Sequence, residues 1–487
     1  MALLILVITP LLAALVSLAV RKKILFLEVT AMIAAPVEFT AAMAIAAEVY
    51  RQGDSEYGVY LAAGPLEIVV LFTVALVGLA AAFYSVGYLR EEVRKQIIGF
   101  SRVRQYFVLF HFFLMAMFFA VITVSPIMMW IAIEATTLST AFLISFYSKA
   151  SSMEAAWKYL IINSIGLLLG FFGTLLFLTP GSESGADRFI DWHALVEGAG
   201  TMNPTLARIA FIFVLIGYGT KVGLAPMHTW LPDAHSKAPS PISAMLSGAL
   251  LNVAMLAILK FKIVTDVATA TSFSRNLMIY FGVVTITIPA FIIITQKNYK
   301  RLFAYSSIEH MGIITLGFGF GGLGTFGALL HMIYHSMAKS VLFFSAGNML
   351  LKYGSTKMMK VRGVLSVLPV TGVLMLIGFL AITGMPPFGI FLTEVYILSA
   401  GIADHLPVVI AVVFLLLLVF VGFLRHIVGM AFSGRTDTDP APGTIGESNL
   451  LTIMPPVLLL ALLVVAGFYL PGPVKSLITS AASLING

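Results

Sequence analysis

The chain has 487 residues, of which 60% are hydrophobic and 10% are charged, and its mean hydropathy is +1.01. These values exclude an ordinary soluble multidomain protein. The net charge of +7 comes from basic residues in short segments between apolar windows, so we interpret it as a topology signal and not as nucleic-acid affinity. Cysteine is absent, which excludes disulfides and any cysteine-ligated iron–sulfur cluster or zinc in this chain.

Apolar windows of roughly 20 residues predict an all-α polytopic membrane protein with about fourteen transmembrane helices. The first window, 1–20, is followed by its basic residues and not preceded by them, so we expect a membrane span and not a cleaved signal peptide. The expected spans are 1–20, 24–49, 62–88, 104–123, 125–147, 155–179, 205–224, 240–262, 276–296, 302–320, 322–351, 364–402, 407–431 and 450–470.

Lysine and arginine gather in alternate loops of this pattern. The basic loops are 21–23, 90–104, 149–158, 297–301, 352–362 and 425–435. The opposite loops, such as 54–56 and 183–197, are acidic or poor in basic residues, although Lys260, Lys262 and Arg275 depart from the pattern. The positive-inside rule therefore predicts a cell (inner, cytoplasmic) membrane protein with its N-terminus and C-terminus outside.

Two expected spans are interrupted by glycine and proline. The run 223–226 (Gly-Leu-Ala-Pro) breaks the seventh span, and 384–387 (Gly-Met-Pro-Pro) breaks the twelfth, five spans later. Because five is odd, the two units enter the membrane from opposite sides, which is typical of inverted repeats around a transport site. We expect three peripheral N-terminal helices (1–103), two inverted five-helix repeats (104–262 and 276–435), and a C-terminal loop with the last helix (436–487).

Ionisable residues inside apolar windows are the strongest functional signal. A charge at the bilayer centre costs about 2.5–3.5 kcal/mol on insertion scales, so retained ones mark ion pathways. We expect Glu134 and Lys221, on neighbouring spans, to form a pair that holds and releases a proton. The alternative is that Lys221 snorkels to the inner surface from a plain helix end. Possible supporting groups near this pair are Lys158, His228, Asp233 and His235.

A second group of polar residues steps by four along one expected helix. The shared face carries His331, His335 and Lys339, which can pass a proton along the helix through water. The alternative is that these polar groups are structural and form hydrogen bonds to neighbouring helices. This segment lacks the glutamate of the zinc-protease helix, and no third metal ligand lies nearby, so we expect no metal site. We also expect no catalytic residue in this chain. Glu394, after the second break, is the expected exit acid or an outer-interface carboxylate. Glu309 is either a supporting group or, with His310 and beside Lys300 and Arg301, part of structural ion pairing near the inner surface.

Two residues of the eighth span, Asn252 and Lys260, are expected to link the halves, with Asn252 holding water and Lys260 carrying charge. The expected order Glu134, Lys221, Lys260, His331/His335/Lys339, Glu394 predicts a row of polar groups near the membrane midplane. Its gaps should be small enough for one or two bridging waters. Glu38 and Glu67, in the early spans, have no assigned role.

Several stretches carry a family resemblance: 154–159 (Glu-Ala-Ala-Trp-Lys-Tyr), 250–254 around Asn252, 300–310 (Lys-Arg-Leu-Phe-Ala-Tyr-Ser-Ser-Ile-Glu-His) and 384–389. With the charged residues above, they resemble the antiporter-like subunits of respiratory complex I, Mrp cation/proton antiporters and membrane-bound hydrogenases, over about 106–435. The hydrogenase-4 component F branch is the most similar. The resemblance implies that these charged residues form a proton channel. Complex I members typically carry lysine where Asn252 stands, which implies that Lys260 takes the central role.

The resemblance also implies a function without an active site in this chain. We expect a proton- or cation-translocating subunit of a membrane-bound redox complex of the group 4 [NiFe] hydrogenase type. No cofactor is expected here, whereas partner subunits would carry iron–sulfur clusters and a [NiFe] centre. Expected partners are other antiporter-like and membrane subunits, peripheral redox subunits and the lipid bilayer, without nucleic acid. The alternatives are an Mrp-type antiporter subunit without a redox partner, a complex I proton-pumping subunit, and a non-transporting assembly scaffold.

Overall fold

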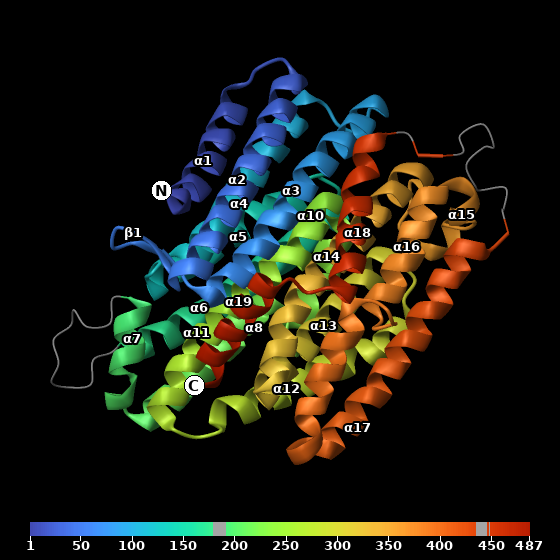
Figure 1. Cartoon of the computed structure of the whole chain (residues 1–487). Coiled ribbons are helices and arrows are strands. Elements are labelled where there is room, and N and C mark those ends of the chain that lie inside the picture. The colour runs from blue at the N-terminus through green and yellow to red at the C-terminus, as the bar shows by residue number, and fades with distance from the viewer. Residues whose placement is uncertain (179–190, 435–445, 448) are drawn as a thin grey trace.

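The computed structural model describes residues 1–178, 191–434, 446–447 and 449–487 (Figure 1). Residue 179 of the sixth expected span, the expected loop residues 183–190 and 435, and residues 436–445 and 448 of the expected C-terminal segment lie outside this range. The elements, in chain order, are α1 (Ala2–Ala19), α2 (Ile24–Gln52), β1 (Ser55–Tyr57), β2 (Leu61–Ala63), α3 (Pro65–Arg94), α4 (Phe100–Ile122), α5 (Pro126–Ile144), α6 (Ala150–Leu178), α7 (Trp192–Gly198), η2 (Ala199–Thr201), α8 (Pro204–Val222), η3 (Met227–Thr229), α9 (Trp230–Lys237), α10 (Ser240–Met245), the π-helical turn η4 (Leu246–Leu250), α11 (Leu251–Thr269), α12 (Phe273–Thr295), α13 (Tyr299–Phe320), α14 (Leu323–Tyr353), η5 (Met358–Lys360), α15 (Val364–Val367), α16 (Pro369–Ile382), α17 (Gly389–Phe432), η7 (Leu450–Thr452), α18 (Met454–Phe468) and α19 (Gly472–Asn486).

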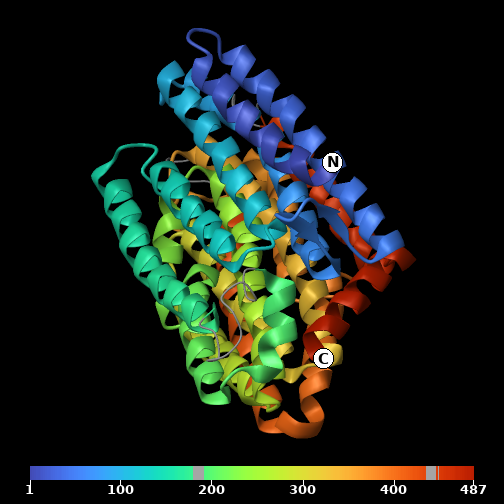
Figure 2. The same ribbon diagram turned by 90° about the vertical axis from the view of Figure 1, so that its left-hand side faces the viewer.

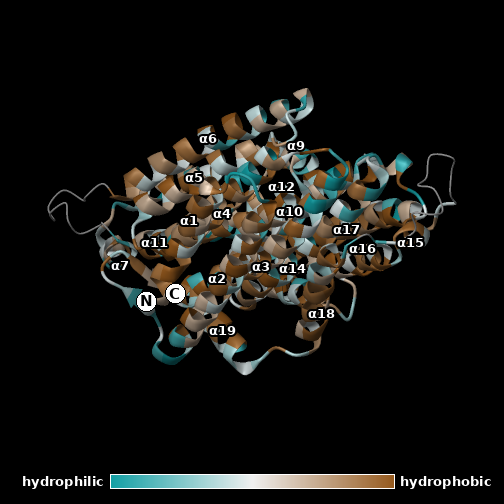
Figure 3. Ribbon diagram, turned by 90° about the horizontal axis from the view of Figure 1, so that it is seen from above, coloured by the Kyte–Doolittle hydropathy of each residue, from teal (hydrophilic) through white to brown (hydrophobic). Residues whose placement is uncertain are grey.

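The protein is a multi-pass membrane bundle. Within the described residues, eleven helices are long and apolar enough to cross a membrane. Helices α13 and α14 are also long, but they carry many of the polar side chains described below, and α16 has only 14 residues. Helices prevail because every backbone amide must find a partner within its own segment where water is absent. Figure 3 shows hydrophobic residues along most of the long helices and hydrophilic ones mainly at helix ends and in loops.

The N-terminal helices form one flank of the bundle. Helices α1, α2 and α4 pack together, and α3 lies between them and the centre, as Figures 1 and 2 show in blue and cyan. An antiparallel β-hairpin, β1–β2, pairs Glu56 with Ala62 between α2 and α3. The hairpin differs from the expectation of a simple loop. The C-terminal helix α19, which the sequence pattern missed, packs against α3 and α14.

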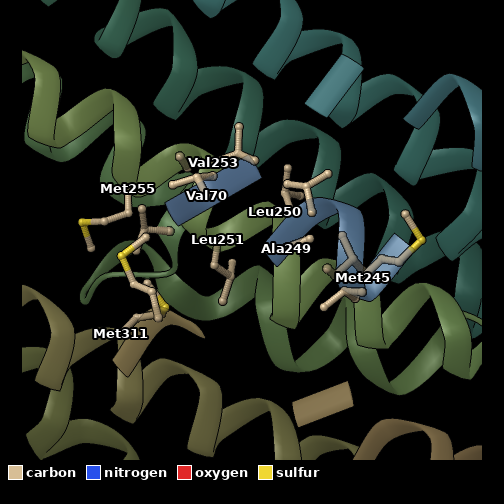
Figure 4. Close-up of a cluster of buried hydrophobic side chains, with 14 of the residues drawn as sticks. Val70, Met245, Ala249, Leu250, Leu251, Val253, Met255 and Met311 are labelled. Atoms are coloured by element: carbon tan, nitrogen blue, oxygen red, sulfur yellow. The ribbon is translucent and has the colours of Figure 1, made fainter. Parts of the chain in front are cut away.

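The most deeply buried helices lie at the centre. The segment from α10 through η4 to α11 is enclosed by α3, α8 and α14, and α13 packs between α12 and α14. Figure 4 shows apolar side chains of α3, α10, η4, α11 and α13 meeting here, among them Val70, Leu251 and Met311. This apolar packing excludes water around the polar groups of the same helices, which strengthens their electrostatic interactions.

Both expected breaks are present. Helix α8 ends at Val222 and is capped by Gly223, whose φ of +86° suits glycine. Helix α16 ends at Ile382, two residues before Gly384, which has a φ of +65°. Backbone groups freed at the first break find side-chain partners: Thr285 Oγ1 accepts from Ala225 N at 3.0 Å, and Trp230 Nε1 donates to Thr220 O at 2.8 Å. Helix α17 joins two helical segments through a non-helical residue, His405, two residues before Pro407.

Candidate functional site

The first polar cluster centres on Lys221, near the C-terminal end of α8. Its side chain is fully buried, and its Nζ donates to Thr137 Oγ1 at 2.8 Å and to Tyr159 OH at 2.7 Å. The ammonium also lies 4.9 Å from the centre of the Tyr159 ring. Because α8 ends one residue later, Lys221 projects where α5 and α6 supply polar groups. The buried position excludes the snorkelling alternative.

Glu134 approaches Lys221 through an intermediate hydroxyl. Its Oε1 accepts from Ser164 Oγ at 2.9 Å, and its Oε2 accepts from Thr137 Oγ1 at 3.4 Å. Thr137 can accept from the ammonium and donate to the carboxylate at once, because a hydroxyl has one proton and two lone pairs. The expected pair is therefore bridged, with Thr137 between the two charges.

The second cluster joins α13 to α14. His310 Nδ1 and His331 Nε2 are 2.9 Å apart, and His310 Nε2 lies 3.4 Å from Glu309 Oε2. The His310 and His335 ring centres are 5.4 Å apart. These side chains are all buried. Two imidazoles at hydrogen-bond distance can act as a donor–acceptor pair whose direction can reverse, an arrangement through which a proton can pass.

Lys339 lies on the same helix face as these two histidines of α14 and also contacts α13. Its Nζ donates to Ser306 Oγ at 2.7 Å and to Phe303 O at 3.1 Å. Neither ring nitrogen of His335 has a hydrogen-bond partner within the described residues. An unpartnered, buried imidazole between His310 and Lys339 is a place for a bridging water or a transient proton.

Helix α17 continues the second cluster beyond His331. Thr393 Oγ1 and His331 Nδ1 are 2.8 Å apart, and Glu394 follows Thr393 directly. The Glu394 carboxylate occupies the space where a Cβ of Gly384 would lie, so the second break and the expected exit acid are in contact.

Asn252 and Lys260 lie apart, contrary to the expectation that they act together. Asn252 Nδ2 donates to Ser336 Oγ at 2.9 Å, which ties α11 to α14 beside His335. Lys260 instead pairs with Glu67 at 2.5 Å and lies 5.0 Å from the Trp192 ring. With these two residues it lines a polar cavity of about 510 Å³ among the loop residues of the acidic end. Lys260 lies eight residues beyond Asn252 along α11, which is roughly 12 Å of helix, so the two side chains reach different groups.

The supporting residues divide between the interior and the surface. Lys158 is half-exposed and pairs with Glu154 at 2.5 Å and Asp233 at 3.8 Å. Asp233 also pairs with Arg301, so this group ties α6, α9 and α13 together. By contrast, His228 and His235 are buried, and His235 stacks on Phe343 of α14 with 4.8 Å between ring centres.

Sequence reasoning missed several members of these clusters, namely Thr137, Tyr159, Ser164, Ser306 and Thr393. It considered His310 only as part of a structural ion pair with Glu309. Thr137 lies one helical turn after Glu134, and His310 follows Glu309, so spacing and adjacency were the available signals. Among the described residues, no group of three or more His, Asp or Glu is arranged to hold a metal ion.

Comparison with known proteins identifies the family. A family model described as "NADH:quinone oxidoreductase/Mrp antiporter, TM" matches residues 123–420, which is more than half of the chain and includes both clusters. The chain belongs to this family. It is an antiporter-like membrane subunit of the type found in complex I-like, Mrp and hydrogenase complexes.

The relatives of this antiporter-like chain include a protein named "Hydrogenase-4 component F homolog" from Methylacidiphilum infernorum. It is 39% identical over 349 residues, which are 71% of this chain and 73% of that protein. A chain of the archaeal membrane-bound sulfane sulfur reductase complex has the same fold, with a TM-score of 0.86, 23% identity, and coverage of 99% of this chain and 97% of that one. A chain of the Mrp complex from Dietzia sp. DQ12-45-1b also has this fold, with a TM-score of 0.85, 19% identity, and coverage of 100% and 97%.

Proposed function

We propose that this chain translocates protons as the antiporter-like subunit of a membrane-bound redox complex of the group 4 [NiFe] hydrogenase type. The observation that carries the proposal is a pair of polar clusters inside an apolar bundle, Glu134–Thr137–Lys221 and Glu309–His310–His331–Thr393, in which every member except the partly exposed Glu134 is buried. Ionisable groups retained at such positions are costly and mark ion pathways. The 39% identity to a hydrogenase-4 component F homolog supports the hydrogenase type of complex.

In this proposal the protons pass between hydrogen-bonded neighbours. The Lys221 ammonium transfers a proton through Thr137 to Glu134 when the pair tightens, and His310 and His331 exchange one across their shared hydrogen bond. Asn252, which is hydrogen-bonded to Ser336, lies between the two clusters. Glu394 releases or takes up the proton beside Gly384. Lys260 is left out of the row because it pairs with Glu67 near the acidic end.

The proposed architecture follows the sequence expectation. We propose fourteen spans, with peripheral helices over 1–103 and inverted repeats over 104–262 and 276–435. The two repeats would relate the break after α8 to the break after α16. We propose an inner (cytoplasmic) membrane location with both termini outside, on the basis of the basic loops. Partner subunits would supply the iron–sulfur clusters and the [NiFe] centre, and electron transfer there would drive ion movement here.

The test uses the complex isolated in mild detergent and then reconstituted into vesicles. Iron–sulfur subunits should co-purify with the chain, whereas their absence from an ion-translocating preparation would favour an Mrp-type antiporter. Glu134→Gln and Lys221→Ala should each slow ion translocation by about tenfold or more while leaving assembly intact. The matched control is Glu154→Gln, which changes an exposed acid of α6. Full translocation in both cluster variants would favour a scaffold role and refute the proposal.

A further inference from the structure

An apolar groove lies on the flank of the bundle where the N-terminal helices meet α18. Helices α2 and α18 both pack on α3 (Figure 1), and a cavity of about 540 Å³ lies between them. We name it the α2–α18 groove. Its lining residues fall within 36–83 and 451–462, outside the region 123–420 that the family model matches. Membership of the family therefore assigns no role to this groove.

The groove presents hydrocarbon to its occupant. Every lining residue except Thr40 has an apolar side chain, and the Thr40 hydroxyl donates to Val37 O of its own helix at 3.0 Å. The rim is accessible, because Leu458 of α18 is 62% exposed. A polar group placed here would find no side-chain partner among the lining residues, which is unfavourable away from water. The part of a ligand that enters the groove is therefore apolar.

The depth of the groove matches one leaflet of a bilayer. From η7 into α18 the lining runs from Leu451 to Leu462, roughly 16 Å of helix, which is half of a typical hydrocarbon core. Beyond Leu462 a smaller apolar cavity, of about 230 Å³, lies against α14 and α19 instead. A transmembrane helix of a partner subunit would need the whole thickness of the core, whereas an acyl chain of one leaflet needs only half of it.

An ion pair lies beyond the groove, toward the end of the bundle that carries the basic loops. Arg90 Nε and Nη2 each donate to the Glu28 carboxylate at 2.7 Å. Arg90 follows Phe83, a lining residue of α3, by two helical turns, so it lies on the same face roughly 10 Å further along. Gly87, between them, faces Leu451, since a Cβ on Gly87 would lie 2.9 Å from the Leu451 Cβ. The ion pair therefore lies at the depth where lipid headgroups begin.

The guanidinium of Arg90 keeps donors for an anion. Its side chain is 46% exposed, whereas that of Glu28 is 6% exposed. The two bonds to Glu28 leave the other N–H groups of the guanidinium available, and these suit a phosphate. The exposed basic residues 21–23 precede α2 at the same end and add positive charge there. A phosphate at this level and an apolar chain in the groove are parts of one kind of ligand.

We propose that the α2–α18 groove binds one anionic phospholipid of the leaflet at the basic end. An acyl chain lies along α3 between α2 and α18, and the phosphate accepts from the Arg90 guanidinium. The bound chain fills space that the protein leaves open and so supports the packing of α18 beside the N-terminal helices. This inference goes beyond the proposed function and does not depend on it.

The first test uses the intact complex in vesicles of phosphatidylcholine. Because this chain contains no cysteine, Leu458→Cys places its single thiol at the groove rim for a bimane fluorophore, and the unaltered complex treated in the same way gives the background. Nitroxide-labelled phosphatidylglycerol should quench the bimane at roughly fivefold lower mole fraction than nitroxide-labelled phosphatidylcholine, the preference that one basic residue at the headgroup gives. The matched control is Val421→Cys, an exposed apolar position on α17 shortly before Arg425, where both lipids should quench equally.

A second measurement asks whether Arg90 binds the phosphate. Arg90→Gln combined with Glu28→Gln removes the guanidinium without leaving a buried carboxylate unpaired. Introduced together with Leu458→Cys, it should reduce the preference for phosphatidylglycerol by about twofold or more, while quenching by phosphatidylcholine stays the same. The matched control is Lys158→Gln with Glu154→Gln, which neutralises an exposed ion pair of α6 at the same end and should keep the preference.

The outcomes that would overturn this site are distinct. Equal quenching by the two lipids in Leu458→Cys would show unselective contact with the bilayer. No quenching by either lipid, with normal quenching in Val421→Cys, would show that a partner subunit covers the groove. A preference unchanged by the Arg90 and Glu28 substitutions would separate the phosphate from Arg90. None of these readouts measures ion translocation, so each leaves the proposed function as it stands.

Discussion

Lys221 and Glu134 are joined through the hydroxyl of Thr137, which lies 2.8 Å from the ammonium and 3.4 Å from the carboxylate. The two charges belong to α8 and α5, and the bridge comes from α5 one turn after the acid. A bridged pair is weaker than a direct one because the Coulomb energy falls with separation. Small helix movements can therefore change the coupling between the two charges, which suits the proton transfer proposed for this pair.

Thr137→Val should uncouple this pair. The substitution keeps the shape of the side chain but leaves the buried ammonium with one side-chain partner fewer, a loss of about 1.5–3 kcal/mol for a hydrogen bond to a charged group. Ion translocation by reconstituted vesicles should fall severalfold with assembly unchanged. The control is Thr136→Val, since the buried Thr136 hydroxyl donates to its own helix at Ile133 O. Equal rates in both variants would remove Thr137 from the path.

His310→Phe should interrupt the second cluster. The change removes the partner of His331 Nε2 and one neighbour of His335, while an aromatic ring still fills the space. Translocation should fall by about tenfold or more. The control is His111→Phe, because His111 of α4 is equally buried among Phe107 and Phe110 and has no hydrogen-bond partner within the described residues. Normal translocation in the His310 variant would show that the histidine pair is structural.

Lys260→Met should act on stability more than on translocation. The Lys260–Glu67 pair is 12% exposed on each side, and removing one member of a buried pair costs up to about 3–5 kcal/mol. The thermal unfolding temperature of the solubilised chain should therefore fall. The double variant Lys260→Met with Glu67→Gln should recover much of this loss, since no charge then remains unpaired. Additive losses would show that the two side chains do not interact.

Gly384→Ala should displace the Glu394 carboxylate. A Cβ at this position would overlap with Glu394 Oε2, and the φ of +65° adds about 1–2 kcal/mol for a residue other than glycine. Translocation and unfolding temperature should both fall. Gly429→Ala in α17 is the control, because nothing lies within 4 Å of its Cβ and alanine favours the helix. Unchanged translocation in Gly384→Ala would separate Glu394 from the path.

The sequence alone determined the membrane bundle, the two helix breaks and the ionisable residues that lie inside apolar segments. Apolar windows and their limits follow directly from the free energy of transfer into hydrocarbon, which is a property of each residue. Glycine and proline likewise mark breaks because their backbone restrictions are local. The positions of Glu134, Lys221, His331 and Glu394 stood out for the same reason, as isolated polar groups in apolar segments.

Only the tertiary structure decided which of these groups meet. Lys260 was expected in the row, between Lys221 and His331, but it pairs with Glu67 near the acidic end. His310 was expected only in a structural ion pair with Glu309, yet α13 packs its ring against His331. A hydrogen bond between residues far apart in the chain depends on helix packing and side-chain direction, and neither is encoded in the spacing along a single helix.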